Sequence, residues 1–218
     1  IKILNFYKLR SKVDLIDVTK NYSSVIISLE KFKEVCKVQT LKGFTTNYND
    51  DLIYIDPRNQ NLGVKMILKE ENVENVIKNL NLKKIDKKKY YEKSYKLGIP
   101  QINLRKLKDK IFGIENNLDE LSGIDFKKGC YIGQENTSRI KLRNKLRRRI
   151  LPIKKVSGEI LENDIIKYKD SEIGKVMINT PYPFALIKIV DPDLKEFCNT
   201  ELVCGDSKIK ILNPEWIS

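Results

Sequence analysis

The residues best suited to chemistry lie in one stretch, residues 127–139, which reads KKGCYIGQENTSR. This stretch places Cys130 between two glycines and continues with an amide, a carboxylate and a guanidinium. Gly129 and Gly133 permit positive φ angles or a close approach of the backbone to a ligand. The density of such residue types in so few positions predicts a shaped functional loop around the thiol.

The residues after this loop predict a helix. The segment QENTSRIKL, residues 134–142, places Glu135 and Arg139 four positions apart, where helical side chains meet. Free amides at the helix start, with Lys127 and Lys128 upstream, favour the thiolate form of a nearby cysteine. The alternative is a small buried cysteine, an ordinary turn and a surface ion pair worth less than about 1 kcal/mol.

Composition excludes several kinds of active site. None of the 218 residues is histidine, so no Ser-His-Asp triad, Cys-His dyad or histidine-ligated metal is available. The formal net charge of +13 favours an anionic partner, such as RNA or a polyanionic cofactor, although coding bias toward lysine explains it equally well. The arginines are more informative because most of them gather in one segment, at Arg139, Arg143, Arg147, Arg148 and Arg149.

The cysteines indicate neither a disulfide scaffold nor a resident metal. They lie at positions 36, 130, 198 and 204, far apart or at spacings unlike CxxC. A resident iron–sulfur cluster usually takes four thiolates, and no second cysteine motif accompanies Cys130. We therefore expect no metal ligands and a reducing compartment. No apolar run approaches the roughly 20 residues that cross a bilayer, so we expect no membrane partner.

The first two thirds of the chain predict an α+β fold. β-branched residues alternate with polar ones in four segments, residues 11–19, 23–29, 51–57 and 61–69, which predicts strands. Helical spacing of apolar residues predicts helices at 29–38, 71–82 and 86–97, with Cys36 filling a core. Residues 101–126 have no regular pattern and lead into the cysteine motif.

The last third predicts a different architecture. Short strands are expected at residues 145–154, 164–170, 171–179, 184–190, 200–206 and 208–212, separated by Asn, Asp, Gly and Pro turns. Several short strands without an intervening helix are typical of a small antiparallel barrel or sandwich. We place the domain boundary near residue 144, which gives an α+β region, residues 1–144, and a β-barrel, residues 145–218.

The cysteine motif resembles a known family. Residues 128–135, KGCYIGQE, followed by Ser138 and Arg139, match without a gap the signature of the YgfZ family of folate-binding proteins. This family is related to the glycine cleavage T-protein, an aminomethyltransferase (GcvT), and to mitochondrial iron–sulfur assembly factors. The segments FYKLRSKVDLIDVT, YKLGIP, NLDELSGIDF and EIGKV also follow the family's order and spacing, so the resemblance covers nearly the whole chain.

The resemblance implies a ring of subdomains that ends in a β-barrel and binds tetrahydrofolate or a derivative. It implies a role in assembling or repairing iron–sulfur clusters, especially those of [4Fe–4S] enzymes, with Cys130 as the functional thiol. The partners implied are folate and the assembly machinery or its [4Fe–4S] client proteins. Relative to the family, the chain is expected to enter the folate-binding region part-way, after the family's leading segment.

The resemblance also assigns residues to the folate site. Glu115 falls where the T-protein has a glutamate that holds the pterin ring, and a carboxylate suits the N–H edge of a pterin. The cofactor-binding residues expected are Glu115, Asn117, Lys128, Gly129, Tyr131, Gly133, Gln134, Glu135 and Arg139. The folate glutamate tail is expected at Arg143 and Arg147–Arg149.

Two other functions remain open from the sequence. An RNA-binding or tRNA-modification protein would use the arginines of residues 139–149 as a phosphate track. A folate-dependent aminomethyltransferase would be an enzyme, whereas the cysteine motif favours the non-enzymatic branch of the family. The location expected is bacterial cytoplasm, or the mitochondrial matrix if the source is eukaryotic.

Overall fold

The structure is a computed structural model that describes residues 1–36, 41–131, 133–143, 146–190 and 192–217. The chain divides into two compact units, Ile1–Lys84 and Ile85–Ser218, each described by itself below. Within the described residues, no helix has both the length and the apolar character needed to cross a membrane.

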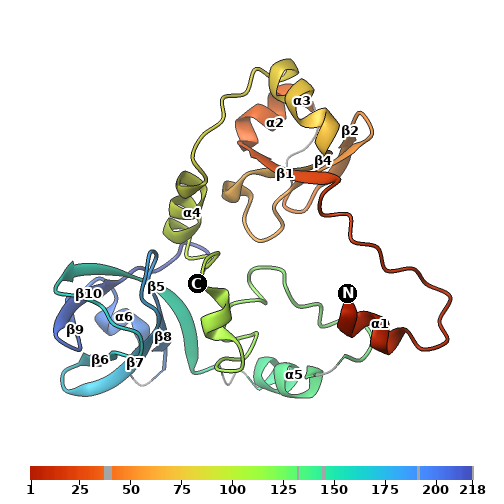
Figure 1. The fold of residues 1–218 in the computed structure, drawn as a ribbon. Coiled ribbons are helices and arrows are strands. Elements are labelled where there is room, and N and C mark those ends of the chain that lie inside the picture. The colour runs from red at the N-terminus through yellow and green to blue at the C-terminus, as the bar shows by residue number, and fades with distance from the viewer. Residues whose placement is uncertain (37–40, 132, 144–145, 191, 218) are drawn as a thin grey trace. The chain divides into compact units, whose positions relative to one another are not determined.

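The first unit contains an antiparallel sheet with the helices Leu29–Val35 and Val73–Asn79 on one face (Figure 1). Its strands follow the order β1-β4-β3-β2 and span β1 (Tyr22–Ile27), β2 (Thr45–Tyr48), β3 (Asp51–Ile55) and β4 (Val64–Lys69). The helices are α1 (Lys2–Lys8), α2 (Leu29–Val35) and α3 (Val73–Asn79), with 3₁₀ turns at Gln60–Leu62 and Glu70–Asn72. The strands predicted at 23–29, 51–57 and 61–69 are confirmed as β1, β3 and β4.

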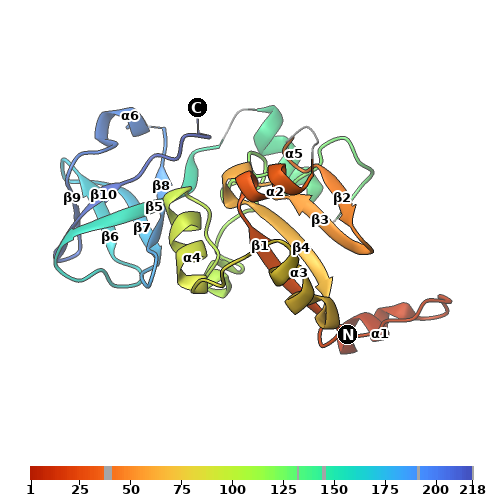
Figure 2. The same ribbon diagram turned by 90° about the horizontal axis from the view of Figure 1, so that it is seen from above.

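The core of this unit lies between the sheet and helices α2 and α3 (Figure 2). Phe32 of α2 and Val76 of α3 pack with Ile53 and Met66 of the sheet, and all four are buried. The predicted helices at 29–38 and 71–82 are confirmed, although residues 37–38 lie outside the described residues. Cys36 packs partly buried against this cluster, as a core filler would.

The N-terminal segment differs from the prediction. Residues 11–19 alternate like a strand, but the structure has a helix at Lys2–Lys8 and no strand from residue 9 to residue 18. Val13 and Ile16 are exposed, at 49% and 77%. Because a strand needs a neighbour for its ladder of hydrogen bonds, and no described strand pairs with this segment, alternation alone does not make it a strand.

A buried ion pair follows β3 and gives the first unit a dependence on pH. Asp56, 1% exposed, accepts hydrogen bonds from Arg58 Nε (3.0 Å), Nη2 (2.7 Å) and the Arg58 backbone N–H (3.0 Å), and Lys65 Nζ lies 3.4 Å away. Burial by itself raises the pKa of Asp56, but these hydrogen bonds and charges outweigh burial, so the pKa lies below its ordinary value.

A carboxyl group whose pKa is lowered by folding stabilises the folded state above its unfolded pKa of about 3.9. This contribution is lost as the pH falls through the lower pKa of the folded state. We therefore expect acidification below about pH 4 to destabilise the first unit more in the wild type than in Asp56→Asn. Amide hydrogen exchange of β3 and β4 from pH 5 to pH 3 measures this difference, and parallel losses in both proteins would contradict it.

The second unit contains a closed six-stranded antiparallel barrel, which confirms the predicted barrel (Figure 1). Its strands, in the order β10-β5-β8-β7-β6-β9, are β5 (Arg148–Ser157), β6 (Ile165–Tyr168), β7 (Ser171–Ile178), β8 (Phe184–Lys188), β9 (Leu202–Cys204) and β10 (Ser207–Ile211). A short helix, α6 (Leu194–Phe197), was not predicted; it has a capping box between Asp193 and Glu196 and contributes the buried Phe197 to the barrel core.

Residues 85–143 belong to the same compact unit as the barrel, whereas the sequence placed a boundary near residue 144. They form α4 (Lys87–Lys96), the 3₁₀ helix Leu104–Leu107 and α5 (Gln134–Leu142). The Tyr95 hydroxyl donates to Ile153 O (2.6 Å), and Trp216 Nε1 donates to Leu97 O (2.6 Å). Burial raises the pKa of Tyr95 to about 12, so its hydroxyl stays protonated as a donor. These bonds attach α4 to the barrel.

Candidate functional site

The motif helix has the predicted bounds. Helix α5 spans Gln134–Leu142, and the side chains of Glu135 and Arg139 form the expected ion pair on its exposed surface. Gly133 precedes the helix with φ +85°, a conformation that other residues adopt with strain, which accounts for glycine here. Gly129 has no positive φ, and its missing side chain faces open space, so close approach to a ligand remains the only predicted reason for glycine there.

The cysteine loop is held by side chains of the motif itself. The backbone N–H of Tyr131 donates to Gln134 Oε1 (3.0 Å), and the Gln134 N–H donates to Tyr131 O (3.1 Å). Lys128 Nζ lies 5.1 Å from the centre of the Tyr131 ring, a cation–π contact. Cys130 is exposed between these residues, so the loop presents its thiol to the solvent.

One polar atom of this loop suggests an absent partner. The Tyr131 hydroxyl oxygen is buried and has no hydrogen-bond partner among the described residues. Buried hydroxyl groups are nearly always hydrogen-bonded, because leaving one unpaired costs roughly 1–3 kcal/mol. A ligand that supplies a polar group at this position fits the loop.

Glu115 lies in an internal ion pair. It is 6% exposed, and its carboxylate accepts hydrogen bonds from Arg148 Nε (2.9 Å) and from the Phe112 backbone N–H (2.9 Å). Arg148 Nη2 also lies 2.9 Å from Glu115 Oε1. These contacts hold the turn at residues 112–115 against the first strand of the barrel, β5.

Asn117 also forms internal hydrogen bonds. It is fully buried with φ +59°, donates from Nδ2 to Ile150 O (2.8 Å) and accepts from Arg149 Nη1 (3.0 Å). Arg149 Nη1 also contacts Glu120 Oε1 (2.6 Å). The arginines at 148 and 149 are therefore committed to internal carboxylates, whereas Arg143 and Arg147 are exposed.

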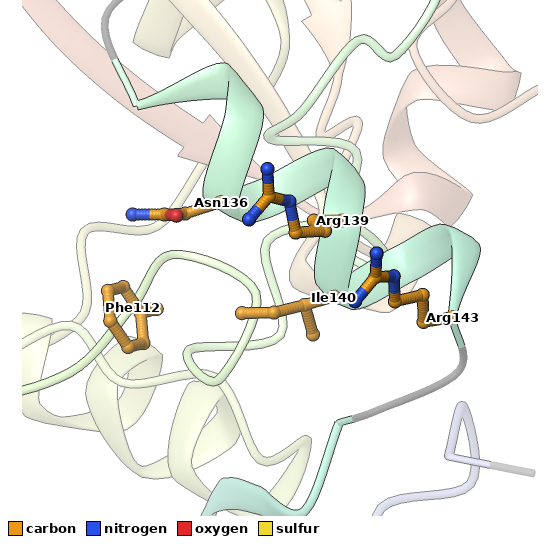
Figure 3. A pocket seen from close by; sticks show the side chains of 5 residues that line it. All are labelled: Phe112, Asn136, Arg139, Ile140 and Arg143. Atoms are coloured by element: carbon orange, nitrogen blue, oxygen red, sulfur yellow. The ribbon is translucent and has the colours of Figure 1, made fainter.

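Helix α5 packs near the turn that carries Glu115. Lys141 forms an ion pair with Asp119, and Ile140 lines two cavities, the smaller of which also contacts Ile114 and Arg149. The larger cavity, of about 230 Å³, is lined by Phe112, Asn136, Arg139, Ile140 and Arg143 (Figure 3). The structure thus brings Arg139 of the predicted site next to Phe112, whose N–H is bonded to Glu115.

Phe112, Asn136 and Ile140 line the larger cavity, although the sequence did not predict a site at these residues. One signal was present, because Asn136, Arg139, Ile140 and Arg143 follow the i, i+3, i+4, i+7 spacing of a single helix face. Phe112 lies in a segment without a regular pattern, so only the folded chain places it beside that face.

The fold and the site define an α+β protein with a closed C-terminal barrel and an exposed cysteine on a loop before a basic helix. No protein-family model matches the chain. It is 34% identical, over 180 residues, to the mitochondrial "Iron-sulfur cluster assembly factor IBA57 homolog" of Dictyostelium discoideum, an alignment that covers 80% of this chain and 40% of that protein.

A second relative carries the same name. The homolog from Neurospora crassa is 26% identical over 203 residues, which cover 93% of this chain and 43% of that protein. The chain therefore spans about two fifths of the length of these relatives. It is a sequence relative of proteins named as iron–sulfur cluster assembly factors, which agrees with the resemblance of the cysteine motif.

Proposed function

We propose that the protein is an iron–sulfur cluster assembly factor that binds tetrahydrofolate or a derivative and uses Cys130 as its functional thiol. The observation that carries the first part is sequence similarity over 80% of the chain to relatives of that name. The cluster is cargo in this proposal, and its targets are [4Fe–4S] enzymes or the machinery that assembles them. Cys130 supplies the thiol, because it is exposed on a loop that the hydrogen bonds between Tyr131 and Gln134 hold in place.

The residues of the turn at 112–115 and of the cysteine loop have polar groups that suit a folate. The Glu115 carboxylate accepts two hydrogen bonds and also contacts Arg148 Nη2. A carboxylate has about four acceptor positions, so it can receive one more hydrogen bond from the N–H edge of a pterin without losing these contacts. The Tyr131 hydroxyl provides a buried polar atom that has no hydrogen-bond partner among the described residues. In this proposal Arg148 holds the Glu115 carboxylate in place, and Gln134 fixes the loop that presents Cys130.

The names of the relatives also favour one location. They describe the Dictyostelium and Neurospora proteins as mitochondrial, and both organisms are eukaryotes. We therefore propose the mitochondrial matrix, the second of the two locations expected from the sequence. Nothing in the comparisons favours bacterial cytoplasm, and no described contact favours the RNA-binding or the aminomethyltransferase alternative.

Calorimetric titration with tetrahydrofolate tests the ligand. We expect binding to the wild type and a loss of about tenfold or more in Glu115→Gln, because the neutral amide replaces a charged acceptor. Glu120→Gln is the matched control, since it breaks a neighbouring glutamate–arginine pair in the same unit and should bind as the wild type does. Equal affinities of the two variants would remove Glu115 from the site, and no binding to the wild type would remove folate from the proposal.

A further inference from the structure

The strands of the barrel carry charge of one sign on their outer surface. Every charged residue of these strands is lysine or arginine except Glu172, whereas the other described acidic residues of the barrel lie in the connections or beyond the last strand. Buried residues such as Ile166, Leu202 and Ile209 fill the core. Because successive side chains of a strand point to opposite faces, the residues next to them in the strands point outward.

One row of outward side chains crosses the neighbouring strands β10, β9 and β6 (Figure 1). Val203 of β9 pairs with Lys208 on one side and with Lys167 on the other. All three are exposed, and Val203 is 52% exposed. Since neighbouring strands lie about 4.8 Å apart, the backbones of the two lysines lie roughly 10 Å apart with the valine between them. Glu172 of β7 pairs with Lys167 and ends the basic surface on that side.

A second pair of lysines lies directly opposite across two strands. Lys154 of β5 pairs with Lys210 of β10, and like charges in opposite positions destabilise a sheet. Lys210 Nζ lies 3.9 Å from Glu201 Oε1, but the side chains of Lys154, Lys167 and Lys208 have no hydrogen bond or ion pair with any described residue. The barrel therefore keeps positive charge here without neutralising it. We call this surface the lysine wall, defined by Lys154, Lys167, Val203, Lys208 and Lys210.

The residue types of the lysine wall favour a protein partner over a nucleic acid. Surfaces that bind nucleic acids commonly use arginine for bidentate phosphate contacts and aromatic rings for stacking on bases. Strands β6, β9 and β10 contain no arginine, and their one aromatic residue, Tyr168, packs against the buried Phe197. The exposed Val203 gains from an apolar neighbour, which another protein supplies and a phosphate backbone does not.

The abundance of lysine also indicates how long the complex lasts. Lysine is depleted from the cores of stable protein interfaces, whereas small charged interfaces are typical of transient complexes. Opposite charges on two proteins accelerate their encounter more than they strengthen the complex. The lysine wall therefore suits a partner that binds quickly and leaves again.

We propose that the lysine wall is the docking surface for an acidic protein, whose carboxylates contact the lysines around an apolar residue placed on Val203. This inference rests on the proposed function, because a factor that hands over an iron–sulfur cluster must bind a protein that supplies or receives the cluster and then release it. The complex should weaken as the ionic strength rises, since the charges on both sides are exposed.

Photo-crosslinking in the protein's own cells tests the surface. The probe is p-benzoylphenylalanine in place of Val203, and mass spectrometry identifies the crosslinked molecule and segment. We expect a protein crosslinked through a segment rich in Asp and Glu, with a yield about fivefold lower when Lys167→Gln and Lys208→Gln are combined. Lys93→Gln with Lys195→Gln is the matched control, because it removes the same charge from exposed lysines of α4 and α6, and it should change the yield less than twofold.

Activity in depleted cells gives a second readout with the same two double variants. We expect the Lys167→Gln and Lys208→Gln protein to restore about threefold less [4Fe–4S] enzyme activity than the Lys93→Gln and Lys195→Gln protein, with the same melting temperature. Both sites are exposed, so neither double variant removes a buried contact.

The other outcomes separate this inference from the proposed function. If the wild type restores activity and the two double variants match it in activity and in crosslinking, the lysine wall is not a docking surface, although the proposed function stands. Equal losses in both double variants would assign the effect to net charge and overturn the inference, as would crosslinks to RNA or lipid alone. If depletion leaves [4Fe–4S] enzymes active, the proposed function fails, whereas a crosslink that depends on Lys167 and Lys208 would still support the docking surface.

Discussion

Replacing Cys130 by alanine is expected to abolish the support of [4Fe–4S] enzymes while leaving the fold intact. The side chain is exposed, so its removal leaves no cavity and should change the melting temperature by less than about 2 °C. Alanine can neither bind iron nor act as a sulfur nucleophile, and no histidine in the chain could take over. This variant should therefore lose its activity and keep its stability.

The comparison requires cells depleted of the protein and supplied with either the wild type or Cys130→Ala, with [4Fe–4S] enzyme activity as the readout. Cys198→Ala is the control, because it makes the same substitution at a half-buried cysteine outside the motif and should restore activity. Full restoration by Cys130→Ala would show that the motif thiol is not required.

The substitution Glu115→Ala is expected to destabilise the second unit by about 2 kcal/mol. It leaves the Phe112 N–H without its acceptor and removes the partner of Arg148. Breaking a fully buried ion pair costs about 3–5 kcal/mol, but the Arg148 side chain is 47% exposed and can turn toward water, which lowers the cost. Glu135→Ala also removes a glutamate–arginine pair, but that pair is on the surface and should contribute less than about 0.5 kcal/mol.

Urea unfolding followed by tryptophan fluorescence measures this difference. Trp216 is the only tryptophan in the sequence and donates to Leu97 O, so its emission reports on the second unit. A loss of about 2 kcal/mol corresponds to a midpoint lower by about 1 M urea. Similar midpoints for Glu115→Ala and Glu135→Ala would mean that the ion pair with Arg148 contributes no more than a surface pair.

Local sequence signals predicted the elements that carry the site. The bounds of α5 followed from residues 133–142, because Gly133, able to adopt positive φ, precedes the helix and an i, i+4 ion pair lies within it. The barrel strands were predictable because turn residues separate short β-branched segments, and the folded chain pairs them into a closed sheet.

The features that depend on distant residues were not predictable. Arg148 lies 33 positions from Glu115, and no local pattern shows that one neutralises the other. The cavity requires Phe112 to meet a helix more than twenty positions later. At residues 11–19 the alternation was clear and the prediction of a strand was wrong, because a strand also depends on the neighbour that pairs with it.

The central claim is that the protein supports iron–sulfur cluster assembly. Its most direct test is to deplete the protein from its own cells and measure the activity and iron content of a [4Fe–4S] enzyme per molecule of that enzyme. We predict that both fall together, while an enzyme of the same compartment without a cluster keeps its activity. Unchanged iron content and activity after complete depletion would contradict the claim.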